Sequence, residues 1–241
     1  MTGKDKKMKI SVTKYTLSAS ISEKIDFLFL SDLHGCDNSP ILDVIKSTPH
    51  DAILFGGDLV HDEKNFERGL ELLGILSELG ETCFLSLGNH EHRFSFDIRE
   101  KIQRFNVTLL DDSDTEFMGI TVAGLSSGEF HNGEPDIGYL ERLSKSDGFK
   151  LLLCHRPEYF PKYIKDLPID LTLSGHAHGG QWRFFGRGIY APGQGIFPKY
   201  TSGIYENRLI VGRGLGNPHL VPRINNSPEI IFLTLLPQNQ K

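Results

Sequence analysis

The sequence predicts a layered α/β fold, and three observations support this prediction. Short apolar runs alternate with segments of helical spacing through most of the chain, and a strand-rich end follows. The apolar runs are continuous, as expected for strands that are buried on both faces. A polar cluster begins directly after several of these runs, and layered α/β folds bind ligands beyond the carboxyl ends of their strands.

The predicted elements follow from the apolar spacing. Apolar residues at every third or fourth position predict a helix over Glu63–Leu79. Further helices are predicted over Pro40–Ser47 and Phe94–Phe105, and Arg187–Ser202 is predicted to be a long loop beside the site. The predicted strands are Ile25–Leu30, Ala52–Phe55, Thr82–Leu87, Ile120–Gly124, Lys150–Cys154, Leu171–Ser174, Leu209–Val211 and Ile230–Leu236.

Length and net charge limit the classes of protein to which the chain can belong. The chain has 241 residues, which fits a single domain over 1–241 with residues 1–8 as a flexible tail. Its formal net charge of −5 provides no positive field, so we expect no nucleic-acid partner. A Lys-rich stretch at the N-terminus is either a solvated tail or a weak contact with a membrane surface. Its members are Lys4, Lys6, Lys7 and Lys9.

Cysteine usage bears on the compartment. Cys36, Cys83 and Cys154 occur without a CxxC pair, which is typical of a reducing environment. Cys83 and Cys154 lie in apolar runs and are predicted to be core residues. No apolar run approaches transmembrane length, and the first residues lack a signal-peptide pattern. We therefore expect a cytoplasmic protein, with peripheral contact to a membrane as the alternative.

Five strand ends carry side chains that bind metals in other proteins. These segments supply carboxylate, amide and imidazole groups and no thiolate, a donor set that suits hard to intermediate cations. Any one of the histidines alone would be an ordinary surface or core residue, but together they predict a metal site. The segments are Asp32-Leu33-His34, Gly57-Asp58, Gly88-Asn89-His90-Glu91, His155 and Gly175-His176-Ala177-His178.

In their order, these segments resemble the signature of calcineurin-like metallophosphoesterases, written DxH, GD, GNH[ED], H and GHxH. The resemblance implies a four-layer α/β/β/α sandwich of the metallo-dependent phosphatase type, with the site at the strand ends. Later segments resemble the bacterial YkuE/YaeI-type branch; they are Gly179-Gly180-Gln181, Gly214-Leu215-Gly216, Pro222-Arg223 and Pro228-Glu229-Ile230.

The same resemblance implies a centre of two divalent metal ions. A water or hydroxide between the ions would be the nucleophile, because the metals lower its pKa and clamp the phosphate oxygens during in-line displacement. Mn²⁺ is expected by resemblance, and Fe, Zn, Co or Ni suit the same donors. The first ion would bind Asp32, His34 and His178, the second Asn89, His155 and His176, with Asp58 bridging both.

His90 follows the expected ligand Asn89, and the resemblance gives it the role of a general acid that protonates the leaving group. Imidazole suits this role because its ordinary pKa lies near neutrality; an orienting role is the alternative. Relatives often place an acidic residue three positions after the bridging Asp to orient this histidine. Here that position is His61, with Asp62 next, so the support of His90 stays open.

Arg156 and His92 are candidates for a substrate-binding rim. The planar guanidinium of Arg156 suits a phosphate, although a salt bridge is the commoner role for such a residue. Arg93, His131 and His219 are weaker candidates for the same rim.

Together these inferences predict a di-metal phosphoester hydrolase that acts on a phosphodiester or on the pyrophosphate of a nucleotide conjugate. The substrate is expected to be a small molecule or lipid-linked, since the aromatic segment from Phe184 to Tyr205 leaves room for acyl chains. A protein phosphatase is disfavoured because its arginine-bearing motifs are not apparent, and the net charge disfavours a nuclease. The alternatives are a non-catalytic scaffold of this fold and hydrolysis of a non-phosphate ester.

Overall fold

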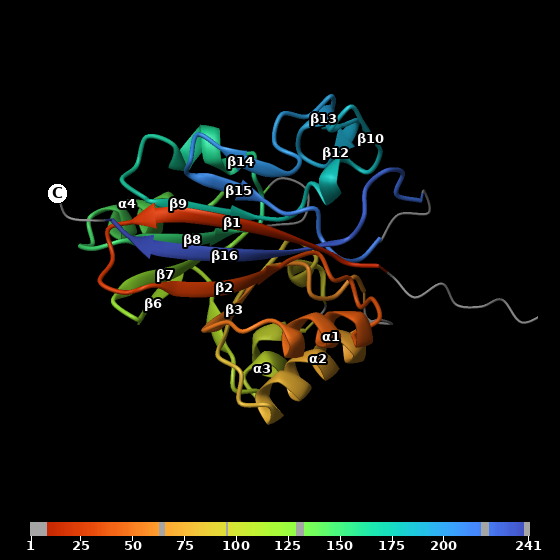
Figure 1. Ribbon diagram of the computed structural model, residues 1–241, viewed down its shortest axis with the longest axis horizontal. Coiled ribbons are helices and arrows are strands. Elements are labelled where there is room, and N and C mark those ends of the chain that lie inside the picture. Colours follow the sequence, from red (N-terminus) through yellow and green to blue (C-terminus); the bar gives the residue numbers. More distant parts are fainter. Residues whose placement is uncertain (1–8, 63–65, 95, 129–132, 218–221, 239–241) are drawn as a thin grey trace, which may run out of the picture.

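The computed structural model describes residues 9–62, 66–94, 96–128, 133–217 and 222–238 (Figure 1). The predicted tail 1–8, the start of the helix predicted from Glu63, and the rim candidates His131 and His219 lie outside these ranges. Two six-stranded sheets pack against each other, and helices cover both outer faces. This arrangement is a four-layer α/β/β/α sandwich, which confirms the predicted fold class.

The first sheet consists, in spatial order, of β1 (Ser11–Ala19), β16 (Glu229–Pro237), β2 (Ile25–Leu30), β3 (Ala52–Gly56), β4 (Cys83–Ser86) and β5 (Thr108–Leu110). Strands β2 to β5 run parallel, whereas β16 runs antiparallel to β2, and β1 runs parallel to β16. Parallel neighbours place their carboxyl ends along one edge, so the loops after β2, β3 and β4 meet there.

The second sheet consists, in spatial order, of β14 (Gly203–Tyr205), β15 (Leu209–Val211), β9 (Leu171–Ser174), β8 (Lys150–Cys154), β7 (Ile120–Leu125) and β6 (Ser113–Phe117). Its four central strands are parallel, and the two edge strands are antiparallel to their neighbours. This sheet therefore also collects its loops at one edge.

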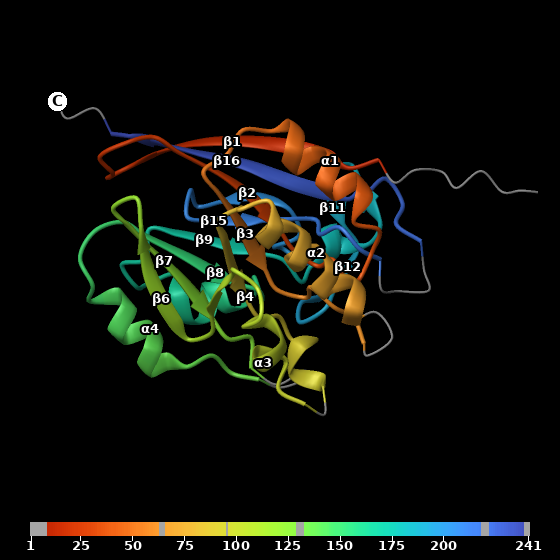
Figure 2. The same ribbon diagram turned by 90° about the horizontal axis from the view of Figure 1, so that it is seen from below.

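Three apolar cores hold the layers together, and Figure 2 shows the arrangement of the helices around the two sheets. Between the sheets, Phe27, Phe29 and Phe84 pack against Leu151 and Leu173. Outside the first sheet lie helices α1 (Ser39–Ser47), α2 (Phe66–Glu78) and α3 (Ile98–Ile102). Outside the second sheet lie α4 (Ile137–Ser144) and the π-helix η2 (Phe160–Ile164). The predicted core residues Cys83 and Cys154 are buried, as expected.

The helix predicted over Phe94–Phe105 is wrong in its extent, because α3 covers only Ile98–Ile102. The Asp97 side chain accepts a hydrogen bond from the Arg99 backbone N–H and so caps the helix there. Phe94 packs against Phe66 of α2, at 5.6 Å between ring centroids. A tertiary contact, rather than a helix, therefore accounts for the aromatic residue before α3.

The long loop predicted over Arg187–Ser202 is wrong in part, since short strands lie within it. Two small hairpins lie between β9 and β14 of the second sheet: β10 (Arg183–Phe184) pairs with β11 (Arg187–Gly188), and β12 (Tyr190–Ala191) pairs with β13 (Gly195–Ile196). They form a lobe at one end of the sandwich (Figure 1). In the described part of the chain, no helix is long and apolar enough to cross a membrane.

Candidate metal centre

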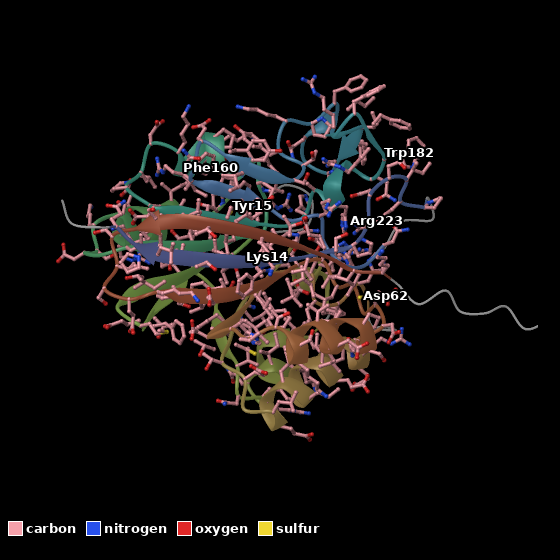
Figure 3. The ribbon with its side chains drawn as sticks, in the orientation of Figure 1. Lys14, Tyr15, Asp62, Phe160, Trp182 and Arg223 are labelled. Atoms are coloured by element: carbon pink, nitrogen blue, oxygen red, sulfur yellow. The ribbon has the colours of Figure 1, made fainter. Side chains whose placement is uncertain are left out.

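The polar segments predicted from the sequence meet at one end of the sandwich. Asp32 and His34 follow β2, Asp58 follows β3, and Asn89 and His90 follow β4 of the first sheet. From the second sheet, His155 follows β8, and His176 and His178 follow β9. The two sets are linked directly, since His155 Nδ1 lies 2.7 Å from the carbonyl oxygen of Gly56 at the end of β3. Figure 3 labels Asp62, Trp182 and Arg223 at this end.

A first group of donors consists of Asp32, His34 and His178, all buried, with one candidate ligand atom of each within 4.8 Å of the others. His178 Nε2 lies 3.5 Å from Asp32 Oδ1. His34 Nε2 lies 3.3 Å from His178 Nε2. Three donor atoms thus converge on one small volume.

A second group consists of Asp58, His155 and His176, which meet the same distance criterion. His155 Nε2 lies 3.2 Å from Asp58 Oδ2. The same carboxylate oxygen lies 3.6 Å from His34 Nε2 of the first group. Asp58 therefore stands between the two groups and belongs geometrically to both.

The residues on either side of Asn89 lie against the Asp58 carboxylate. The His90 backbone N–H donates to Asp58 Oδ1 at 3.0 Å, and a Cβ on Gly88 would lie 2.2 Å from the same oxygen. The contact is so close that only glycine fits before Asn89. Asn89 itself is buried, and its Oδ1 has no hydrogen-bond partner among the described residues.

The backbone of this centre is unusual. Five of the seven predicted ligands have left-handed φ angles, a conformation that residues other than glycine adopt infrequently. Such conformations persist only where the surrounding structure enforces them, and they concentrate at functional sites. The five residues and their φ angles are Asp32 (52°), His34 (49°), Asp58 (55°), His176 (63°) and His178 (46°).

Several buried polar atoms of the centre have no hydrogen-bond partner among the described residues. A buried unsatisfied polar atom costs about 1–3 kcal/mol, so a folded protein rarely keeps several together without a ligand. Their chemistry, carboxylate and amide oxygen with imidazole nitrogen, is that of metal ligands. These atoms include Asp32 Oδ2, Asn89 Oδ1 and His176 Nε2.

Burial controls the charges of the imidazoles. It lowers the pKa values of His34 and His176 well below the ordinary histidine value, so both rings are neutral. Burial acts in the same sense on His155, but the adjacent Asp58 carboxylate overcomes it and raises the pKa of His155 to about 9. Burial alone would raise the pKa of Asp58, but the charge of His155 lowers it well below the usual range. Asp58 is therefore an anion.

Glu91 is a supporting residue whose role sequence reasoning missed. Its buried carboxylate accepts hydrogen bonds from the backbone N–H groups of Asp58 (2.9 Å), Val60 (3.2 Å) and Gly88 (2.7 Å). It thereby fixes the loops after β3 and β4 to each other. The acidic residue that closes the GNH[ED] motif was the available signal. Burial, followed by the charge of Asp58, raises the pKa of Glu91 to about 7.

His90 is oriented by a backbone group. Its Nδ1 lies 2.9 Å from the carbonyl oxygen of His61, and its Nε2 lies 4.0 Å from Asp58 Oδ2. The ring of His61 lies 4.7 Å from that of His90, centroid to centroid. The open question of what supports His90 thus has an answer in the main chain of His61.

The two substrate-rim candidates are held by neighbouring loops. Arg156 is buried, and its Nε donates to the Ser127 carbonyl oxygen at 3.1 Å. Its Nη1 lies 3.8 Å from Glu158 Oε1, which in turn lies 3.8 Å from His176 Nε2. His92 is half-buried, with Nε2 3.1 Å from Ser126 Oγ. Arg156 is thus next to the centre, whereas His92 contacts the loop after β7.

Two residues from the end of the chain support His178. Asn226 Nδ2 donates to the His178 carbonyl oxygen at 2.7 Å, and Arg223 Nη2 lies 3.4 Å from His178 Nδ1. Arg223 also donates to the Gly216 carbonyl oxygen. Nothing in the local sequence marks Asn226 for this role, because the contact joins segments far apart in the chain.

Comparison with known proteins places the chain in a family. Residues 25–180 match the calcineurin-like phosphoesterase family, a range that includes every motif from Asp32 to His178. The chain is 31% identical to the uncharacterized metallophosphoesterase YkuE of Bacillus subtilis, over 95% of this chain and 87% of that protein. It is 29% identical to the phosphodiesterase YaeI of Escherichia coli, over 87% of this chain and 81% of that protein. It is also 29% identical to an uncharacterized metallophosphoesterase of Helicobacter pylori, of which it spans 62%. The chain therefore belongs to the calcineurin-like phosphoesterases and is a metal-dependent phosphoesterase.

Proposed function

We propose that this phosphoesterase is a phosphodiesterase with a two-metal centre in which Asp58 bridges the ions. The position of the Asp58 carboxylate carries the proposal. Its Oδ2 lies 3.6 Å from His34 Nε2 in one donor group and 3.2 Å from His155 Nε2 in the other. A carboxylate shared by two donor groups suits a pair of ions about 3.5–4 Å apart.

The donor residues fit two divalent cations. The buried side chains of Asp32, Asn89, His155 and His176 supply oxygen and nitrogen donors and no thiolate, a set that suits Mn²⁺, Fe, Zn, Co or Ni. Among these ions, the resemblance to calcineurin-like phosphoesterases favours Mn²⁺. When bound, the ions would lower the pKa of a water nucleophile and offset negative charge on the phosphate. One ion would be held by Asp32, His34 and His178, and the other by Asn89, His155 and His176, with Asp58 between them.

His90 would act as the general acid. Because its Nδ1 faces the His61 carbonyl oxygen and donates to it, Nε2 is the ring nitrogen left to face the substrate. Nε2 lies 4.0 Å from Asp58 Oδ2, on the side where a substrate phosphate would sit. Transfer of the Nε2 proton to the departing oxygen avoids release of an alkoxide, which is a poor leaving group.

The substrate is a phosphodiester or the pyrophosphate of a nucleotide conjugate, of small-molecule or lipid-linked type. The likeness to YaeI, which is named a phosphodiesterase, supports the diester. Arg156 would contact a phosphate oxygen from beside the centre, and His92 would lie farther out on the rim. The second candidate function, a non-catalytic scaffold, is disfavoured because all seven expected ligands and His90 are present.

We propose the cytoplasm as the location. Cys36, Cys83 and Cys154 are all unpaired, which suits a reducing compartment.

The test is hydrolysis of bis-p-nitrophenyl phosphate and p-nitrophenyl phosphate by metal-free protein reconstituted with Mn²⁺. Wild type should hydrolyse the diester in preference to the monoester, and only with metal. Asp58→Asn should lose about 10³-fold or more in kcat/KM together with bound metal. His90→Asn should keep its metal and lose about 10²–10⁴-fold in kcat.

His50→Gln is the matched control, since it also removes an imidazole with little exposure, one that pairs with Glu81 instead of lying at the centre. It should keep activity and metal content. A folded wild-type protein that binds no metal and hydrolyses neither compound would overturn the proposal in favour of the scaffold. Faster hydrolysis of p-nitrophenyl acetate than of either phosphate would favour a non-phosphate ester.

A further inference from the structure

Exposed apolar side chains gather on the two hairpins beside the metal centre. In the part of the chain that the structure describes, twelve large hydrophobic side chains are exposed, and six of them lie between Trp182 and Phe197. Phe185 is fully exposed, Phe197 is 77% exposed and Ile196 is 71% exposed. Figure 3 shows side chains with rings projecting from this lobe. A concentration of apolar side chains on one face marks an interaction surface rather than ordinary surface composition.

The backbone at two of these residues is unfavourable for the side chain it carries. Phe185 (φ 51°) and Phe197 (φ 54°) are in the left-handed region, where glycine and asparagine are the usual residues. Phe185 occupies the turn between β10 and β11, next to Gly186. A turn that served only to join two strands would favour a small or polar residue, so these exposed rings point to a function outside the fold.

The charge of this region is opposite to that of the whole chain. The chain has a net charge of −5, yet no Asp or Glu occurs from Leu171 to Tyr205, a stretch that contains Arg183, Arg187 and Lys199. The first acidic residue after it, Glu206, has its Oε2 3.8 Å from Lys165 Nζ. The surface is thus apolar and cationic at once.

The exposed residue Phe197 is one of those that line a pocket of about 490 Å³. Exposed Arg187 and Lys199 line it together with Thr201 and Tyr205. The two cations and the Thr201 hydroxyl group are suitable donors for an anionic phosphate group. The neighbouring ring would then lie where the acyl chains of a lipid carrying that phosphate begin.

We propose that this hairpin face, defined as residues 182–199, is a docking surface for an anionic lipid bilayer. The rings of Phe185 and Phe197 enter the interfacial region, and Arg187 and Lys199 contact lipid phosphates. Aromatic and basic side chains together are the composition that proteins use at a membrane interface. A docking site for another protein would not require the combination of a stretch without acidic residues and a cationic pocket beside an exposed aromatic ring.

The hairpins pack closely against the segments that carry the metal centre. A Cβ on Gly180, in the turn after His178, would lie 2.3 Å from the Cα of Gly188 in β11. A Cβ on Gly193 would lie 2.0 Å from Glu158 Oε1, the atom that lies 3.8 Å from His176 Nε2. Docking of the hairpin face would therefore hold the centre next to the bilayer surface. The docking itself does not depend on the proposed diesterase activity.

The test is sedimentation of the full chain with vesicles of phosphatidylcholine alone and with vesicles of equal parts phosphatidylcholine and phosphatidylglycerol. Wild type should bind the anionic vesicles more tightly, and added salt should weaken the binding. Arg187→Gln and Lys199→Gln should each weaken it by about fivefold. Phe185→Ser combined with Phe197→Ser should weaken binding to the anionic vesicles by about tenfold or more.

Matched controls change the same types of residue elsewhere on the surface. Leu79→Ser removes an exposed apolar side chain after α2, and Lys46→Gln with Lys145→Gln removes two exposed cations; neither should change vesicle binding. Equal loss in the controls, or no binding by wild type, would overturn the proposal. Wild-type dimers that the Phe185→Ser and Phe197→Ser variant loses, without vesicle binding, would assign the face to a second copy of the chain. Because sedimentation needs no turnover, failure here is distinguishable from failure of the diesterase proposal.

Discussion

The metal centre and the hairpin face are neighbours, and they depart from the usual distribution of side chains in opposite directions. The centre buries polar atoms such as Asp32 Oδ2 and His176 Nε2 without a hydrogen-bond partner among the described residues. The hairpin face exposes Phe185 and Phe197 to solvent. Each arrangement is unfavourable in the protein alone, and the ligands proposed for the two regions would account for it.

The two regions share one feature, which is a left-handed backbone at residues with side chains. At the centre the strain is stabilised by buried hydrogen bonds, including those from Asp58 and Gly88 to Glu91. On the hairpins it occurs at exposed turns with little burial. We therefore expect that strain at the centre is enforced by the fold, whereas strain on the hairpins can be removed without unfolding the protein.

The largest expected effect concerns Glu91, the residue that enforces the geometry of the centre. Glu91→Ala leaves three buried backbone N–H groups without an acceptor and should lower the free energy of unfolding by about 3–5 kcal/mol. Urea unfolding measures this, and metal content should fall in parallel. The exposed Glu100 provides the control: Glu100→Ala should change stability by less than about 0.5 kcal/mol. Equal effects of the two changes would show that Glu91 does not enforce the geometry of the centre.

The second prediction concerns the junction between the two regions. Gly180 (φ 77°) and Gly195 (φ 75°) have nearly the same φ angle. Of the two, Gly180 is the one at which an added Cβ would meet another atom. Gly195→Ala should lower stability by about 1 kcal/mol, the cost of a left-handed alanine. Gly180→Ala should lower it by about 2–4 kcal/mol, because the clash with Gly188 adds to that cost. Thermal unfolding of the two variants checks this prediction. Equal losses of stability would mean that the segments of Gly180 and Gly188 are not packed closely against each other.

The third prediction concerns the pH dependence of metal binding. In the metal-free protein, His155 carries a proton below its raised pKa of about 9, whereas the pKa values of His34 and His176 are well below normal. A metal must displace the His155 proton, so affinity should rise about tenfold per pH unit up to about pH 9 and level off above it. Competition with a chelator at several pH values measures this. A flat profile below about pH 9 would show that His155 is neutral before metal binds.

The smallest expected effect tests whether strain on the hairpins is dispensable. Phe185→Asn places a residue that tolerates the left-handed region at an exposed turn and should raise stability by about 0.5–1 kcal/mol. Tyr190→Asn, at an exposed position without a positive φ, should give no such gain. Urea unfolding compares the two. A loss of stability in Phe185→Asn would mean that the ring packs within the fold and would weaken the contrast between the regions.

Much of the fold follows from local sequence pattern. The runs Ile25–Leu30 and Lys150–Cys154 form strands with the predicted bounds, because a continuous apolar run between polar residues has few alternatives to a buried strand. The edge strand β1 was not predicted, since Ser11–Ala19 alternates exposed and half-buried residues and carries polar side chains. Its place is decided by pairing with β16, more than 200 residues away in the chain.

The side chains at the strand ends follow from the local sequence, because a strand and the residue after it are contiguous in the chain. That is why Asp32, Asp58 and His155 could be named together. The contacts that support the centre appear only in the folded structure: the His61 carbonyl oxygen next to His90, Asn226 next to His178, and the hairpins against Gly180. These contacts use backbone groups and close approach between distant segments, and side-chain identity along the chain carries little information about either.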